Sequence, residues 1–178
     1  EVKAAQQPGV DISSLRGTAM TLRSAVEQSK NGVAYSVFND IKPSYGLSFL
    51  TQMKFDRIAP SDYTLSAALG GLTYGATTVQ MASGYSTLVN QGEYRNPSCL
   101  ISLKDHEGKE LYKAEESKIV YTKEGSSTML DILKGVLTNG TAKSMGWSSV
   151  SDVPAAGKTG TTNSSKDGWF CGVTPYYT

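Results

Sequence analysis

The stretch that decides the fold is Lys158-Thr159-Gly160-Thr161-Thr162. It follows a run of small residues, 154–157 (PAAG), and precedes 169–173 (WFCGV), whose composition predicts a strand. A lysine and threonine hydroxyls on one extended segment form a receptor for a carboxylate, because the lysine supplies positive charge and the hydroxyls donate hydrogen bonds. Gly160 has no side chain, so an extended ligand can lie close to the backbone. Taken alone, the segment is equally consistent with an exposed strand whose polar residues are solvated.

A second polar element, Ser29-Lys30-Asn31, lies far upstream. Residues 21–28 predict a short helix with Thr21 as its N-cap, and residues 33–41 predict another helix that ends before Pro43. Ser29 and Asn31 are therefore expected on a tight turn between two helices, facing the same way, which suits side chains that reach into a cleft. Serine and asparagine also favour turns for purely local reasons.

In this order, Ser-x-Asn before Lys-Thr-Gly, the two motifs resemble those of penicillin-binding proteins, of the class A (bifunctional) type. Each motif occurs once and is weak by itself, but their joint occurrence inside matching flanks is specific. The resemblance extends from about Leu15 to Tyr177 and corresponds to the later part of the transpeptidase domain. The flanks that carry it are residues 21–31, 69–71, 81–85, 139–142, 157–163 and 166–170.

The resemblance implies an α+β fold in which helices flank a five-stranded antiparallel sheet. This chain would supply helices and only the third and fourth strands, residues 155–162 and 169–174. We therefore expect residues 1–178 to be a partial transpeptidase domain that lacks its last strand and the upstream Ser-x-x-Lys segment. No lysine here has serine three positions before it; the nearest approach is Thr51-Gln52-Met53-Lys54.

By the same resemblance, the parent protein is a peptidoglycan D,D-transpeptidase. It would cross-link stem peptides that end in D-Ala-D-Ala through a serine acyl-enzyme, and it would be a target of β-lactam antibiotics. Because the nucleophile is missing, the chain alone is expected to be inactive. The resemblance also implies a location on the extracytoplasmic face of the bacterial cell membrane, with the anchor outside this chain.

The family's roles transfer to individual residues. Ser29 would pass a proton to the leaving amine, and Asn31 would bind the backbone amide of the substrate. Lys158, Thr159 and Thr161 would hold the terminal carboxylate, with Gly160 opening the strand to the ligand. The backbone N–H of Thr161 would be one oxyanion donor.

The sequence bears differently on two other functions. A serine β-lactamase needs a deacylating glutamate, and no glutamate here begins a Glu-x-x-Leu-Asn pattern. A non-catalytic wall-binding or structural module that has lost its serine stays open, and the sequence upstream would distinguish it from a partial enzyme.

The charge balance and the few cysteine and histidine residues argue against nucleic-acid and metal partners. Seventeen basic and sixteen acidic residues give a net charge of +1 with no basic run, which argues against nucleic-acid binding. Cys99, Cys171 and His106 have no zinc-ligand spacing, and no metal or cofactor is expected. Each cysteine lies in an apolar, strand-like run, so we expect free thiols.

The rest of the chain predicts helices near residues 45–53 and 77–90 and a strongly amphipathic helix around 128–137 that ends at Asn139-Gly140. Residues 55–74 predict a long irregular connection. Residues 99–103 and 109–112 predict a hairpin around a turn that holds His106. Since two strands rarely form a stable sheet, we expect the open strand edges to bind the missing part of the same domain or a second copy of the chain.

Overall fold

A computed structural model of the chain describes residues 20–112, 115–162 and 165–178. Residues 1–17, whose polar sequence predicts an irregular lead-in, lie outside this range. The fold combines helices with short antiparallel strands, which confirms the α+β prediction. The α-helices are α1 (Leu22–Glu27), α2 (Asn31–Ile41), α3 (Pro43–Gln52), α4 (Thr78–Val89), α5 (Lys123–Thr138) and α6 (Trp147–Val150); the strands are β1 (Glu93–Tyr94), β2 (Lys118–Ile119), β3 (Ala156–Thr161) and β4 (Gly168–Val173).

The N-terminal helices follow the predicted pattern with shifted boundaries. The Thr21 hydroxyl caps α1 by accepting a hydrogen bond from the Ser24 N–H. Helix α2 begins at Asn31, two residues before the predicted start. The first N–H groups of a helix have no partner within the helix, so polar residues that lack the apolar pattern can occupy its first turn. Helix α3 begins at Pro43 because proline is favoured at the first helical position.

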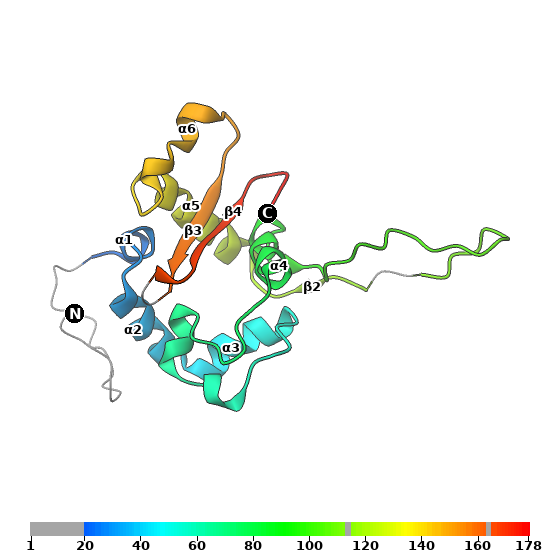
Figure 1. Cartoon of the computed structure of the whole chain (residues 1–178), viewed down its shortest axis with the longest axis horizontal. Helices are drawn as coiled ribbons and strands as arrows, with labels where there is room; N and C mark the ends of the chain where they lie inside the picture. Colours follow the sequence, from blue (N-terminus) through cyan, green and yellow to red (C-terminus); the bar gives the residue numbers. More distant parts are fainter. Residues whose placement is uncertain (1–19, 113–114, 163–164) are drawn as a thin grey trace.

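Strands β3 and β4 form the hairpin that the sequence predicts; β3 is one residue shorter at each end, and β4 begins and ends one residue earlier than expected. Lys158 pairs with Cys171 and Ala156 with Val173, and partners directly opposite share one face of the sheet. On that face, Ala156 and Val173 are buried against α5. Figure 1 shows the two strands side by side, with β3 running past α1 toward α2.

Helix α5 supplies the main core. Thr122 caps its start by accepting from the Gly125 N–H, and its buried face consists of Leu133, Val136 and Leu137, as the amphipathic pattern predicts. Helix α4 packs against α5 and β4 and adds Tyr85 and Leu88 to this core. A second cluster joins Met53, Phe55, Tyr94 and Val120.

The connection at residues 55–74 is irregular, as expected, except for two short 3-10 helices, Pro60–Asp62 and Leu65–Leu69. The Asp62 carboxylate is buried in it and accepts hydrogen bonds from the Ala59 N–H at 2.8 Å and from the Thr73 N–H and hydroxyl at 2.7 and 2.6 Å. These bonds, first that of the Thr73 hydroxyl, hold the pKa of Asp62 below its usual value.

The region between α4 and α5 departs from the prediction. Strands β1 and β2 form a two-residue antiparallel ladder that the sequence did not reveal, because two residues are too few for an alternating pattern. The expected hairpin at 99–112 has its turn, closed by the Asp105 N–H and the Lys109 carbonyl at 2.9 Å, but beyond it only one bridge, Lys104 with Glu110, rather than two strands. In Figure 1 this arm projects away from the body, where no third strand or helix supports it.

Both cysteines are free, as expected: Cys99 is exposed on the arm and Cys171 lies on β4. Within the described ranges, none of the helices has the length and apolar character needed to cross a membrane.

Candidate active site

The site is built on a strained turn at the end of α1. The Ser29 N–H binds the Val26 carbonyl at 3.1 Å and the Lys30 N–H binds the Ala25 carbonyl at 2.9 Å, which is the bond pattern of a Schellman C-cap. The residue in the left-handed position of this cap is usually glycine, but here it is Ser29, with a φ of 52°. Left-handed backbone at a residue with a Cβ is costly and is found at functional sites more often than elsewhere.

Strand β3 brings Lys158 to this turn. The Lys158 Nζ donates a hydrogen bond to the Ser29 Oγ at 2.7 Å, although the residues are 129 positions apart in sequence. The structure therefore brings together the two motifs, and it places the ammonium and the hydroxyl on the same side of the molecule. A charged donor strengthens such a bond and makes the Ser29 proton easier to release.

The environment of Lys158 adjusts its charge. The side chain is half-buried, and burial lowers the pKa of its ammonium below the ordinary value for lysine. Its Nζ also donates to the Thr159 carbonyl at 2.9 Å, which fixes the direction of the side chain. Directly across the ladder, burial raises the pKa of the Cys171 thiol and favours its neutral form.

The loop after α5 joins the two halves of the site. The Gln28 Nε2 donates to the Asn139 carbonyl at 2.9 Å, and the Thr141 N–H donates to the Glu27 carbonyl at 3.1 Å. The Thr141 hydroxyl lies 2.6 Å from the Thr159 hydroxyl on β3. The sequence identified residues 139–142 only as a matching flank, because nothing local predicts a contact with a strand 18 residues later.

The remaining predicted residues take exposed positions near these contacts. Asn31 is the first residue of α2, and within the part of the chain that the structure describes its side-chain amide has no hydrogen-bond partner. Thr161 is the last residue of β3 and pairs with Gly168. A Cβ at Gly160 would meet only the Trp169 Cβ, at 3.4 Å, so the strand itself does not require glycine here.

The β3–β4 turn is closed by polar contacts that follow the motif. The Asp167 N–H donates to the Thr162 Oγ1 at 2.8 Å, and the Thr162 N–H donates to the Asp167 carbonyl at 3.1 Å. Thr162 therefore shapes the hairpin. Asn163 lies outside the described residues.

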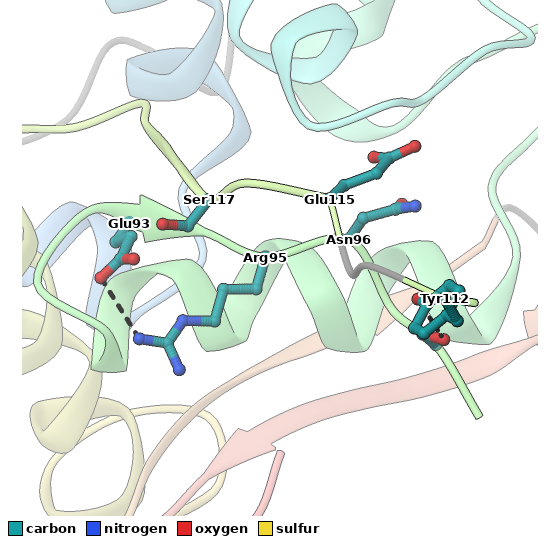
Figure 2. Close-up of a pocket in the computed structure, with 7 residues that line it drawn as sticks. Glu93, Arg95, Asn96, Tyr112, Glu115 and Ser117 are labelled. Atoms are coloured by element: carbon teal, nitrogen blue, oxygen red, sulfur yellow. Dashed lines mark hydrogen bonds and ion pairs between the residues drawn. The ribbon is translucent and has the colours of Figure 1, made fainter. Parts of the chain in front are cut away.

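A separate hollow of about 320 Å³ lies at the base of the arm and contains none of the predicted site residues. Figure 2 shows Arg95 turned toward Glu93, 3.5 Å away, while Glu115 and Asn96 point away from this pair. At the far end, the Ser98 and Tyr112 hydroxyls are 3.2 Å apart. Its polar groups largely bind each other, so the hollow offers less chemistry than the Ser29–Lys158 contact. Among the residues that the structure describes, no cluster of His, Cys, Asp and Glu is suited to hold a metal.

Comparison with known proteins shows the family of this chain. The family described as penicillin binding protein transpeptidase domain matches residues 4–178. This chain belongs to that family. Two relatives named penicillin-binding protein 1A support the class A assignment. The one from Clostridium novyi is 34% identical over 88% of this chain, and the one from Clostridium perfringens is 31% identical over 96%.

Solved penicillin-binding proteins share the fold. Penicillin-binding protein 1A from Haemophilus influenzae has a TM-score of 0.72 at 23% identity and covers 96% of this chain. The D,D-transpeptidase domain of a peptidoglycan glycosyltransferase from Eggerthella lenta has a TM-score of 0.68 at 22% identity. This chain spans only 18% and 26% of the two clostridial relatives, and 31% and 45% of the two solved chains.

Proposed function

We propose that this chain supplies the Ser-x-Asn and Lys-Thr-Gly half of a serine D,D-transpeptidase that cross-links peptidoglycan stem peptides ending in D-Ala-D-Ala. The observation that carries the proposal is the hydrogen bond of 2.7 Å from the Lys158 Nζ to the Ser29 Oγ. An ammonium aimed at a serine hydroxyl is an arrangement that suits the movement of a proton, because the positive charge stabilises the serine oxygen when its proton leaves.

In this proposal the attacking serine belongs to a Ser-x-x-Lys segment of the parent protein. The lysine of that segment takes the proton of the serine hydroxyl as the serine oxygen bonds to the carbonyl of the penultimate D-alanine. The peptide bond breaks, the terminal D-alanine leaves as an amine, and the proton held by that lysine then replaces the one that Ser29 gives up. Ser29 donates its proton to that amine, and Lys158 makes the donation easier because its positive charge stabilises the oxygen left behind. An amine of a second stem peptide then resolves the acyl-enzyme.

The substrate's terminal carboxylate would bind the exposed end of β3. The Lys158 ammonium provides the opposite charge, and the Thr159 and Thr161 hydroxyls provide donors. Asn31, whose amide is exposed beside Ser29, would bind the substrate backbone. Because β-lactams present a carboxylate next to a reactive carbonyl, the same groups would hold them.

The proposal extends to the setting of the parent protein: the extracytoplasmic face of a bacterial membrane, with the open edge of β4 covered by the rest of the domain or by a second copy. Without the nucleophile this chain is inactive by itself. The alternative, a non-catalytic wall-binding or structural module, requires a parent protein that penicillin does not acylate.

The test uses the full-length parent protein and a fluorescent penicillin. Wild-type protein should form a covalent adduct, and Lys158→Ala should lower the second-order acylation rate about ten- to hundredfold, since a hydrogen bond to a charged group contributes about 1.5–3 kcal/mol. The matched control is Lys30→Ala, which removes an exposed lysine beside Ser29 and should leave the rate unchanged.

A penicillin whose carboxylate is blocked as an ester sharpens the comparison. It should react slowly with wild-type protein and lose much less on Lys158→Ala, because it has no anion for the ammonium to attract. An unlabelled wild-type parent favours the non-catalytic module. A Lys158→Ala variant that reacts at the wild-type rate removes Lys158 from the site.

A further inference from the structure

We infer that Thr141 is a positioning residue for the substrate carboxylate and acts through the hydroxyl of Thr159. This inference rests on the proposed function and adds to it a residue outside the Ser-x-Asn and Lys-Thr-Gly motifs. The observation is the distance of 2.6 Å between the Thr141 Oγ1 and the Thr159 Oγ1, which lies within the range for a hydrogen bond between two hydroxyls.

The chemistry of this pair depends on which hydroxyl donates. If Thr159 donates to Thr141, its only proton is used and it cannot bind an anion. If Thr141 donates to Thr159, the Thr159 proton is free to reach a ligand, and the bond it accepts makes it a better donor. A bound carboxylate accepts hydrogen bonds and cannot donate them, so it selects the second arrangement.

Backbone contacts of the loop hold the Thr141 hydroxyl beside Thr159. The Thr141 N–H binds the Glu27 carbonyl at 3.1 Å, and the next residue binds back to α5 through the Ala142 N–H and the Val136 carbonyl at 3.0 Å. Position 140 accepts no residue larger than glycine, because a Cβ there would lie 2.2 Å from the Glu27 carbonyl oxygen. The loop is therefore packed against α1 and has little freedom to withdraw Thr141 from β3.

The same loop also holds the other half of the site. The Gln28 Nε2 donates to the Asn139 carbonyl at 2.9 Å, one residue before the strained Ser29. Residues 139–141 thus contact both the turn that carries Ser29 and the strand that carries Thr159. This segment sets the spacing between the proton-transfer group and the carboxylate receptor, and Thr141 is its only hydroxyl.

The experiment compares Thr141→Val, Thr141→Ser and Thr138→Val in the full-length parent protein. Thr141→Val keeps the shape and removes the hydroxyl, and Thr141→Ser restores it. Thr138→Val is the matched control, because among the described residues this exposed hydroxyl binds only the Lys134 carbonyl of its own helix, at 3.5 Å. Each variant is acylated with penicillin and with the penicillin ester, and its melting temperature is measured.

For penicillin, Thr141→Val should lower the second-order acylation rate about two- to tenfold, the range expected for one neutral hydrogen bond. Thr141→Ser and Thr138→Val should stay near the wild-type rate. For the ester, which lacks the carboxylate, Thr141→Val should react like wild type. The ratio of the two rates separates positioning from damage to the fold, which would slow both reagents and lower the melting temperature.

Three results would overturn the inference. A wild-type penicillin rate in Thr141→Val means that the hydroxyl is not used. An equal loss for penicillin and ester means that Thr141 serves the fold only. An unreactive wild-type parent refutes the proposed function and this inference with it, whereas the first two results leave the proposed function intact.

Discussion

Ser29→Gly should stabilise the protein relative to Ser29→Ala while removing the same hydroxyl. Ser29 has a φ of 52°, in the left-handed region, at the position of a helix C-cap that glycine normally fills. Both variants lose the contact with Lys158, so the difference between them reports the backbone alone. Comparison with wild type would mix strain with the lost hydroxyl.

The magnitude follows from two opposing terms. A residue with a Cβ loses about 1–2 kcal/mol in the left-handed conformation, which glycine avoids. Glycine also increases the entropy of the unfolded chain, which lowers the free energy of unfolding by about 0.4–1 kcal/mol. The net advantage of glycine is therefore about 0.5–1 kcal/mol. For a domain of 150–250 residues this corresponds to a melting temperature higher by about 1–4 °C.

The assay measures the thermal unfolding of the parent's transpeptidase domain by fluorescence, and acylation by penicillin in the same preparations. Both variants should lose about a hundredfold or more of the acylation rate, the lower end of what general acid–base catalysis contributes. If Ser29→Gly melts at or below Ser29→Ala, the strain argument is refuted. If Ser29→Gly keeps the wild-type acylation rate, the Ser29 hydroxyl takes no part in proton transfer.

Two further outcomes are expected. Burial lowers the pKa of Lys158, so its charge is lost at a lower pH than the ordinary lysine value of about 10.4. The rate of penicillin acylation of the parent should therefore fall at alkaline pH as Lys158 loses its charge. The Lys158→Arg variant should react more slowly than wild type at neutral pH, but its rate should not fall at alkaline pH because arginine stays charged. The isolated 178-residue chain should form no acyl adduct with penicillin, because none of its serines has a lysine three residues later; a stoichiometric adduct found by mass spectrometry on Ser29 or any other serine would contradict this.

The packing of the helices explains how Ser29 and Lys158, which are 129 positions apart in sequence, come into contact. The strand bearing Lys158 packs on α5, and α5 packs on α1, so the core of Leu133, Val136 and Leu137 is what brings them within hydrogen-bond distance. Site geometry here depends on helix packing rather than on either motif alone. Substitutions in the buried face of α5 should therefore change the distance between Ser29 and Lys158 without removing a group that takes part in the reaction.

The sequence by itself determined the elements whose signals are local. Thr21 caps α1 as the sequence predicts, and the buried face of α5 follows its apolar spacing. The β3–β4 hairpin follows from two apolar or small-residue runs around a polar turn. The motif residues were identified by their resemblance to the motifs of penicillin-binding proteins, and a lysine beside threonine hydroxyls also suits a carboxylate receptor.

Only the tertiary structure decided which of these residues meet and what else joins them. The left-handed backbone of Ser29 comes from a C-cap that a sequence without glycine does not announce. The ladder of β1 and β2 closes across a connection of more than twenty residues, so no local pattern records it. Thr141 entered the site because α5 ends beside both α1 and β3, and a contact between surfaces of separate elements depends on packing, which periodicity and propensity do not encode.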